Sequence, residues 1–279
     1  YIHNGQGPQP FFWRAPTDND YGAKLPTRLK AWREASYQTP KAESFNISKD
    51  GDKSIVKVTY RFPQVDAQWE ITYKVFANGI IKVDNRFVAE GTETPMIPRV
   101  GLRMQLSEIL NDLTYYGRGP EENYRDRRTS QFIGEYTTPI KDLYEPYIRP
   151  QENEHRTDIY WCALTTKQKA GLLFIADRTF ELNASNYLLG SLDSGETIDN
   201  GAPRTNETNH RHLTDPQPVK QVDMFIDYRM MGVGGDNSWG AIAHEPYLIR
   251  PGVENAIEYG FSIVPFDKKA DYKNLIYQY

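Results

Sequence analysis

A glycine-rich segment that ends in a tryptophan, at residues 232–240, is the sharpest local feature of this sequence. Its glycines allow unusual backbone angles and a close approach by another molecule. An indole at the end of such a loop can stack on the apolar face of a pyranose ring while polar neighbours bind its hydroxyl groups. Trp239 could equally anchor the loop against a core, since tryptophan is intermediate in burial. No Lys-Ser or Lys-Thr pair follows the glycines, so this is not a phosphate-binding loop.

A second segment, near the start of the chain, contains three adjacent side chains that carry oxygen. Asp18, Asn19 and Asp20 could cap a turn or the start of a helix, and they could also offer ligands to a cation. A calcium loop needs more ligands at set spacing and ends in a bidentate glutamate. Lys24 and Arg28 do not supply those ligands. We therefore expect no metal here.

Two further segments combine acids and bases. Residues 115–127 alternate in charge towards their end, and Arg127 could clamp a carboxylate with two parallel hydrogen bonds. Within residues 150–156, Glu152 and His155 could in principle do acid–base work. The simpler interpretation of both segments is that polar loop residues hold one another in place.

Two histidines lie close together in the sequence. His210 and His212 would face the same side of a strand and could bind a metal there. No cysteine or carboxylate at ligand spacing is near them in the sequence, which favours a structural or pH-sensitive role. The chain has a single cysteine, Cys162, in an apolar run, so it is expected to be a buried hydrophobic residue.

Composition and charge narrow the classes of protein. The chain has 279 residues, 39% hydrophobic and 25% charged, as in a globular protein with a sizeable core. A net charge of −4 and the lack of an unbroken basic cluster argue against a nucleic-acid partner. No apolar run reaches the length of a membrane span. The chain begins with Tyr1 rather than Met, so we expect a piece of a longer protein, in the cytoplasm or the periplasm.

Strand patterns dominate the rest of the sequence. Trp69, Ile71, Tyr73 and Val75 alternate with polar residues, which is typical of a half-buried strand. An Asn-Gly pair follows at 78–79, and it predicts an antiparallel hairpin over residues 69–87. Further strands are predicted at 55–60, 100–106, 160–164, 171–176, 222–228 and 257–263.

Other elements are scarce. Residues 27–35 could form one short helix, while 115–153 and 193–218 are expected to be long, irregular segments. Many short strands separated by Pro, Gly and Asn indicate an all-β sandwich or barrel. No segment resembles a linker. We therefore expect one domain over residues 1–279, with residues 1–20 as a lead-in segment that packs on it.

Four segments together are similar to a known family. They resemble, in the same order, the last domain of family 2 glycoside hydrolases of the large bacterial β-galactosidase type. The segments are Phe-Trp-Arg-Ala-Pro-Thr-Asp-Asn-Asp at 12–20, Gly-Arg-Gly-Pro-Glu-Glu-Asn-Tyr-Arg-Asp-Arg at 117–127, Tyr-Glu-Pro-Tyr through Pro-Gln-Glu-Asn at 144–153, and Gly-Gly-Asp-Asn-Ser-Trp at 234–239.

The resemblance implies a large antiparallel β-supersandwich that is galactose mutarotase-like. It also implies an enzyme that hydrolyses terminal β-galactosides with retention, by two glutamates about 5 Å apart. Those glutamates, and the magnesium and sodium ligands, would lie in upstream domains that include the catalytic barrel. No cofactor is expected in this chain, and the isolated chain is expected to be inactive. The full enzyme would be a homo-oligomer.

The resemblance carries over to particular residues. At the position of Trp239 the family has a tryptophan that reaches the mouth of the active site and stacks on the leaving-group sugar. Other positions match the family motifs without a catalytic role, and we expect them to form an ion-paired frame that positions the loops: Arg14, Asp18, Asp20, Arg127 and Glu152.

Two other functions remain open on the sequence alone. A free-standing carbohydrate-binding module would need an exposed aromatic platform and would bind sugar by itself. A mutarotase-like epimerase would need an acid and a base that face each other in a groove, and kinship of fold alone is only an analogy. The candidates for such a pair are His155, His212, Glu152 and Glu245.

Overall fold

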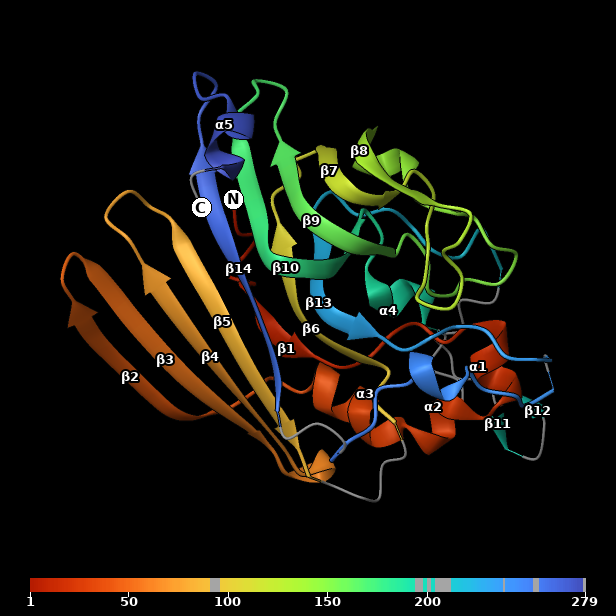
Figure 1. Ribbon diagram of the computed structural model, residues 1–279. Coiled ribbons are helices and arrows are strands. Elements are labelled where there is room, and N and C mark those ends of the chain that lie inside the picture. Colours follow the sequence, from red (N-terminus) through yellow and green to blue (C-terminus); the bar gives the residue numbers. More distant parts are fainter. Residues whose placement is uncertain are drawn as a thin grey trace.

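The structure of the protein is a computed structural model. It describes residues 1–90, 96–193, 198–199, 202–203, 212–237, 239–252 and 256–277. In these ranges the chain forms one 12-stranded sheet, one two-stranded sheet and a few short helices (Figure 1). The predicted fold class, a large and antiparallel all-β architecture, is confirmed.

The strands of the large sheet follow the order β1-β6-β13-β10-β14-β5-β4-β3-β2, and each neighbouring pair is antiparallel. Strand β9 branches off this path because it pairs with both β10 and β7, and β7 pairs in turn with β8. The strands are β1 (Gln9–Phe11), β2 (Ala42–Asp50), β3 (Lys53–Phe62), β4 (Ala67–Val75), β5 (Ile81–Ala89), β6 (Arg99–Leu106), β7 (Asp112–Gly119), β8 (Phe132–Pro139), β9 (Arg156–Thr165), β10 (Gly171–Ser185), β11 (Ile198–Asp199), β12 (Ala202–Pro203), β13 (Val222–Met230) and β14 (Ile257–Phe266).

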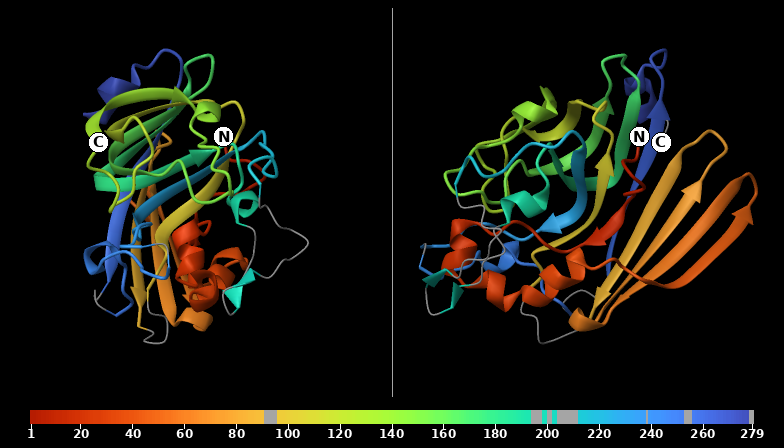
Figure 2. Two further views of the ribbon diagram at one scale, coloured as in Figure 1. Left: turned by 90° about the vertical axis from the view of Figure 1, so that its right-hand side faces the viewer. Right: turned by 180° about the vertical axis from the view of Figure 1, so that it is seen from behind.

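The long strand β10 joins two parts of the sheet. Its first residues, 171–176, pair with β14 on one side and with β9 on the other. Its last residues, 181–185, pair with β13. Strands β2 to β5 form a wing that leans away from the other strands. The front view in Figure 1 and the back view at the right of Figure 2 both show this.

The helices are short and gather mainly at one end of the molecule. Figure 1 shows α1, α2 and α3 together near the end of β13. The helix predicted at 27–35 is divided between two helices, because the helical conformation is interrupted at Leu29. The helical elements are α1 (Asp18–Gly22), α2 (Leu25–Arg28), α3 (Lys30–Tyr37), α4 (Leu189–Leu192), α5 (Tyr272–Ile276) and single 3₁₀ turns at Pro63–Val65, Ile140–Asp142 and Glu245–Tyr247. In the described ranges, no helix has the length and apolarity needed to cross a membrane.

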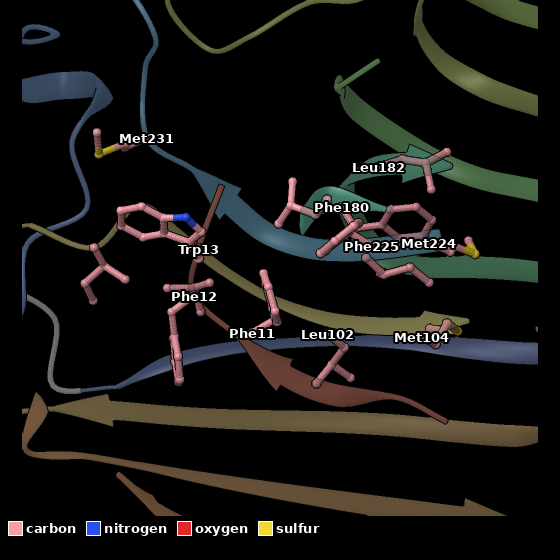
Figure 3. Packing of buried hydrophobic residues seen from close by; sticks show 14 of the residues in the cluster. Phe11, Phe12, Trp13, Leu102, Met104, Phe180, Leu182, Met224, Phe225 and Met231 are labelled. Carbon is pink, nitrogen blue, oxygen red and sulfur yellow. The ribbon is translucent and has the colours of Figure 1, made fainter. Parts of the chain in front are cut away.

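The aromatic residues that precede α1 lie inside the main hydrophobic core. Phe11 is on β1, which pairs with β6, and its ring meets the ring of Phe225 on β13 at 5.4 Å. The ring of Phe12 lies 5.0 Å from Phe62 and 5.5 Å from Trp69. Figure 3 shows Phe11 and Phe12 near buried side chains of β6, β10 and β13. Aromatic pairs of this kind stabilise a core beyond the area that they bury.

Most predicted strands are confirmed, and the errors are strands that were missed. The hairpin at 69–87 is β4 and β5, which pair in register on either side of a turn at Gly79 with φ +85°. The prediction of an irregular segment from 115 to 153 is wrong, because it contains most of β7 and all of β8. Strand β2 was also not predicted. Every residue of β2 is exposed, including Phe45 and Ile47, which alternate with polar residues.

Candidate functional site

The Trp239 side chain projects into solvent. The loop that carries it follows β13, and Trp239 is 92% exposed, the most exposed large hydrophobic side chain in the described part of the chain. Its backbone N–H donates to Oδ1 of Asn237 at 2.8 Å, which gives the loop tip a local turn. The indole therefore does not anchor the loop against the core, which was the alternative left open by the sequence.

The base of the same loop is held by a carboxylate from a distant segment. The Asp126 side chain accepts hydrogen bonds from the backbone N–H of Val233 at 3.1 Å and of Gly234 at 2.7 Å. A Cβ atom on Gly232 would lie 2.5 Å from Oδ2 of Asp126. Glycine at 232 thus lets the carboxylate approach the backbone, which is the close approach that the glycine-rich segment predicted.

A buried ion pair supports this base from the other side. Nη2 of Arg14 lies 2.7 Å from Oδ1 of Asp20, and both side chains are almost fully buried. The guanidinium also donates to the backbone oxygens of Met231 at 2.6 Å and of Gly232 at 3.1 Å. The segment before α1 is therefore tied directly to the start of the Trp239 loop.

The start of α1 explains why Asp20 is available for this pair. Thr17 and Asp20 form a capping box, in which the Thr17 hydroxyl accepts from the N–H of Asp20 and the Asp20 carboxylate accepts from the N–H of Thr17. Asp18 lies on the surface, where Gln151 donates to its carboxylate at 3.4 Å. Within the described residues, Asp18 is in no ion pair.

Glu152 belongs to a second buried group of charges centred on Arg99. Nη2 of Arg99 lies 2.9 Å from Oε1 of Glu152, and Nε lies 3.1 Å from Oδ2 of Asp227. Arg99 is 0% exposed, and its guanidinium lies 4.3 Å from the centre of the Phe225 ring. Oε2 of Glu152 accepts from the N–H of Ala15, so this group is joined to the segment that contains Arg14.

Asn183 links Arg99 to a histidine. Oδ1 of Asn183 accepts from Nη2 of Arg99 at 2.9 Å and lies 2.7 Å from Nδ1 of His155. Nε2 of His155 lies 3.0 Å from Oε2 of Glu181, whose other oxygen pairs with Arg125 at 2.6 Å. We call these residues, with Glu152 and Asp227, the buried network. All the members except Arg125 are 5% exposed or less.

Three acids in or next to this network have pKa values that are shifted by their surroundings. Burial raises the pKa of Asp227 to about 7, although Arg99 opposes the shift. Burial also raises the pKa of Glu154 to about 8. Burial alone would raise the pKa of Glu181, but the hydrogen bond and the charge of His155 lower it overall. All three acids are buried, so they offer little access for a substrate.

Arg127 lies at the surface, next to a small cavity. It forms an ion pair with Glu122, which also accepts a hydrogen bond from Tyr147. A cavity of about 120 Å³ lies beside it, lined in part by Asp18 and Glu152. Val233, the start of the Trp239 loop, lines the same cavity. Three of the five expected frame residues and the base of the loop thus border one hollow.

The candidates for an epimerase do not form an acid–base pair in a groove. Glu152 and His155 are both in the buried network, on either side of Asn183. Glu245 is exposed and pairs with Arg250, and His212 is exposed elsewhere on the chain. His210 lies outside the described residues. Among the described residues, no three His, Cys, Asp or Glu side chains are grouped so as to hold a metal ion.

Sequence reasoning missed four residues that hold the site together: Arg99, Asp126, Glu181 and Asp227. Only Asp126 had a signal, since it lies within one of the four segments that resemble the family. Asp227 lies in the strand predicted at 222–228, while Arg99 and Glu181 lie on β6 and β10, outside the strands predicted at 100–106 and 171–176. Charged residues in a strand are normally assigned to its solvent face, and here they point inwards because Arg99 pairs with Asp227 and Glu181 pairs with Arg125.

Comparison with known proteins gives the family. A family model described as "Beta galactosidase small chain" matches residues 1–263. The chain belongs to this β-galactosidase small-chain family. A β-galactosidase of Priestia megaterium is 32% identical over 243 residues, which cover 87% of this chain and 22% of that protein. A β-galactosidase of Lactobacillus delbrueckii subsp. bulgaricus is 32% identical over 245 residues, again 87% of this chain and 22% of that protein.

The chain therefore spans about a fifth of the length of the curated relatives that it matches. Among solved structures, the galactosidase domain of the α-galactosidase-sucrose kinase AgaSK is similar with a TM-score of 0.42 and 9% identity, over 81% of this chain and 28% of that chain. A GalM/aldose epimerase homologue from C. elegans is similar with a TM-score of 0.39 and 10% identity, over 80% of this chain and 68% of that chain. Membership of the family thus comes from the sequence matches.

Proposed function

We propose that this chain is the C-terminal part of a retaining β-galactosidase of glycoside hydrolase family 2, in which Trp239 forms part of the subsite for the leaving-group sugar. The observation that carries this proposal is the exposure of Trp239, at 92%, on a loop whose base is tied to buried charges. An exposed indole on a loop whose base is hydrogen-bonded to Arg14 and Asp126 is suited to stack on a sugar ring that arrives from outside the chain.

We further propose that the catalytic glutamates lie in a part of the enzyme beyond this chain. The buried carboxylates of Glu152, Glu181 and Asp227 are at most 3% exposed and are already paired with arginine or histidine. A retaining glycosidase needs two carboxyl groups about 5 Å apart on either side of an accessible bond. Magnesium and sodium would also bind outside this chain, and the complete enzyme would be a homo-oligomer of such longer chains.

The first experiment is hydrolysis of o-nitrophenyl β-galactoside by the purified 279-residue chain, with and without magnesium. We expect no turnover in either condition. Turnover that persists through further purification would place catalytic groups within this chain and would overturn the proposal.

The second experiment tests Trp239 in an active β-galactosidase that contains this chain. We expect Trp239→Ala to weaken lactose hydrolysis and acceptor binding of glucose by about 5- to 150-fold, which corresponds to about 1–3 kcal/mol for one aromatic stack. Trp239→Phe should retain part of the stack and lose less. Phe132→Ala, at another exposed aromatic residue, is the matched control and should change neither property. Unchanged lactose and acceptor kinetics in Trp239→Ala would contradict the stacking role.

The same exposure of Trp239 also supports a second function, a carbohydrate-binding module that acts without the rest of an enzyme. The two functions differ in what the isolated chain does. A module would bind lactose or galactose to the 279-residue chain alone, and Trp239→Ala would abolish that binding. In the β-galactosidase proposal the sugar needs surfaces from outside this chain, so the isolated chain should bind neither sugar measurably.

A further inference from the structure

A large polar hollow lies on another part of the sheet, and the proposed function does not use it. It has a volume of about 840 Å³ and is lined by residues of β4, β5, β14, β10 and β13, together with Arg125 and Ala256. We call this hollow the trough. Its volume is within the range of sites that hold small molecules. Trp239 and the expected frame residues are not part of its lining.

The carboxylates that line the trough are all neutralised by cations. Each of the four has a lysine or an arginine as an ion-pair partner within the described part of the chain. The pairs are Glu70 with Lys57, Asp84 with Lys74, Asp177 with Lys82, and Glu258 with Arg86. The acidic side chains therefore leave little uncompensated negative charge in the trough.

Unlike the carboxylates, the arginines that line the trough do not all have an ion-pair partner. Arg86 pairs with Glu258, and Arg125 pairs with Glu181 of the buried network. Arg178 on β10 and Arg229 on β13 form no ion pair or hydrogen bond with any described residue. Moreover, Nε of Arg229 is buried without a hydrogen-bond partner. A buried donor of this kind costs free energy unless a partner is supplied.

The backbone of β13 turns Arg229 into the trough beside an aromatic ring. The pairing of β13 with β6 shifts register between Asp227 and Arg229, so that Tyr228 and Arg229 both line the trough while Asp227 faces the buried network. The guanidinium of Arg229 lies 5.0 Å from the centre of the Tyr228 ring. The Tyr259 ring lies 6.2 Å from that of Tyr228 and extends the aromatic surface.

We propose that this end of the trough binds an acidic sugar, with its oxyanion on Arg178 and Arg229 and its ring against Tyr228. The anion is a carboxylate or a phosphate, since guanidinium binds both with paired hydrogen bonds. Unpaired positive charge supplies the attraction, and the buried Nε of Arg229 supplies a donor that the protein leaves unused. Tyrosine rings next to the cation favour a ligand with a ring over a bare ion.

Calorimetric titration of the 279-residue chain at physiological salt tests the site. The probes are galacturonate and galactose 6-phosphate, with galactose and inorganic phosphate as references. We expect at least one acidic sugar to bind about tenfold more tightly than either reference. The better of the two identifies the anion as carboxylate or phosphate. Absence of binding by both at about 10 mM would overturn the proposal, and so would equal binding of inorganic phosphate and galactose 6-phosphate.

Three variants locate the binding. Arg178→Gln and Arg229→Gln should each weaken the acidic sugar about tenfold, and Arg178 is exposed, so its variant should fold normally. Arg86→Gln makes the same change of charge in the same trough but removes an arginine that already has a partner. It should change the affinity less than about threefold, because the charge of Arg86 is already paired with Glu258 and salt screens an exposed pair. Equal effects of Arg86→Gln and Arg229→Gln would overturn the assignment to this end of the trough.

A fourth variant separates this site from the proposed β-galactosidase function. Trp239→Ala should leave binding of the acidic sugar unchanged, because Trp239 is not in the lining of the trough. A loss of binding in Trp239→Ala would place the acidic sugar at the loop and would overturn its assignment to the trough. The chromogenic assay and this titration can therefore fail independently of each other.

Discussion

The base and the tip of the Trp239 loop lie a few residues apart but are stabilised in opposite ways. At the base, Met231 and Gly232 are buried, and Arg14 donates hydrogen bonds to both backbone oxygens. At the tip, Trp239 is almost fully exposed, and the nearby pair of His244 and Asp236 is exposed as well. The base sets where the loop lies and the tip offers a surface. Substitutions at the base should therefore alter stability, and substitutions at the tip should alter binding alone.

The largest effect is expected where the charges beneath the base are most deeply buried. Arg99→Met would leave Glu152 and Asp227 without their cation, and we expect a loss of about 3–5 kcal/mol in the free energy of unfolding. Urea denaturation at neutral pH measures it. Arg86→Met, which breaks an exposed pair with Glu258, is the control and should cost less than about 1 kcal/mol. Similar losses in both variants would remove the distinction between buried and exposed charge.

The next effect concerns pH. Burial raises the pKa of Glu154 from its ordinary 4.5 to about 8, so between these values the folded chain holds a proton that the unfolded chain has lost. The contribution of Glu154 to the free energy of unfolding is fully present below about pH 4.5. It is lost as the pH rises towards 8, by up to about 1.4 kcal/mol per pH unit. Glu154→Gln, which is always neutral, should flatten this part of the profile. An unchanged slope, measured by urea denaturation across the range, would show that Glu154 is ionised inside the fold.

A smaller effect is expected at the link between base and tip. Asp126→Asn removes a charged acceptor from the N–H groups of Val233 and Gly234, and we expect a loss of about 1.5–3 kcal/mol and faster hydrogen exchange at those two amides. Asp236→Asn, in the exposed pair at the tip, is the matched control and should change stability by less than about 0.5 kcal/mol. If the amides of Val233 and Gly234 exchanged as slowly in Asp126→Asn as in the unsubstituted protein, the carboxylate would not be what holds the base.

The smallest effect on stability is expected at the tip itself. Trp239→Ala should change the free energy of unfolding by less than about 0.5 kcal/mol, since the indole contacts little of the protein. Trp13→Ala, at an indole that is 2% exposed in the core, should cost about 3–5 kcal/mol under the same conditions. Thermal unfolding of both variants makes the comparison. A large loss in Trp239→Ala would mean that the tip packs on the protein in solution.

A strand with a regularly alternating buried face was predictable, and the strands β2 and β8, which have no buried residue, were missed. The alternation from Trp69 to Val75 predicted β4 because its buried face meets the core. Strand β8 escaped prediction because it alternates only between exposed and half-buried residues and pairs on one side with β7 alone. The broken helix has a similar cause. Leu29 and Trp32 share a buried face as predicted, but periodicity carries no signal for the break between α2 and α3.

The sequence alone determined the all-β class, the family and the glycine-rich loop with Trp239 at its end, because these depend on residue types at short spacing. Only the tertiary structure decided which charges meet. Arg99 and Asp227, or Asp126 and Val233, are more than a hundred residues apart in the chain. It also decided that Trp239 points outwards while Trp13 is buried. Burial and ion pairing depend on segments that meet only when the sheet is assembled, so the local pattern around each residue cannot specify them.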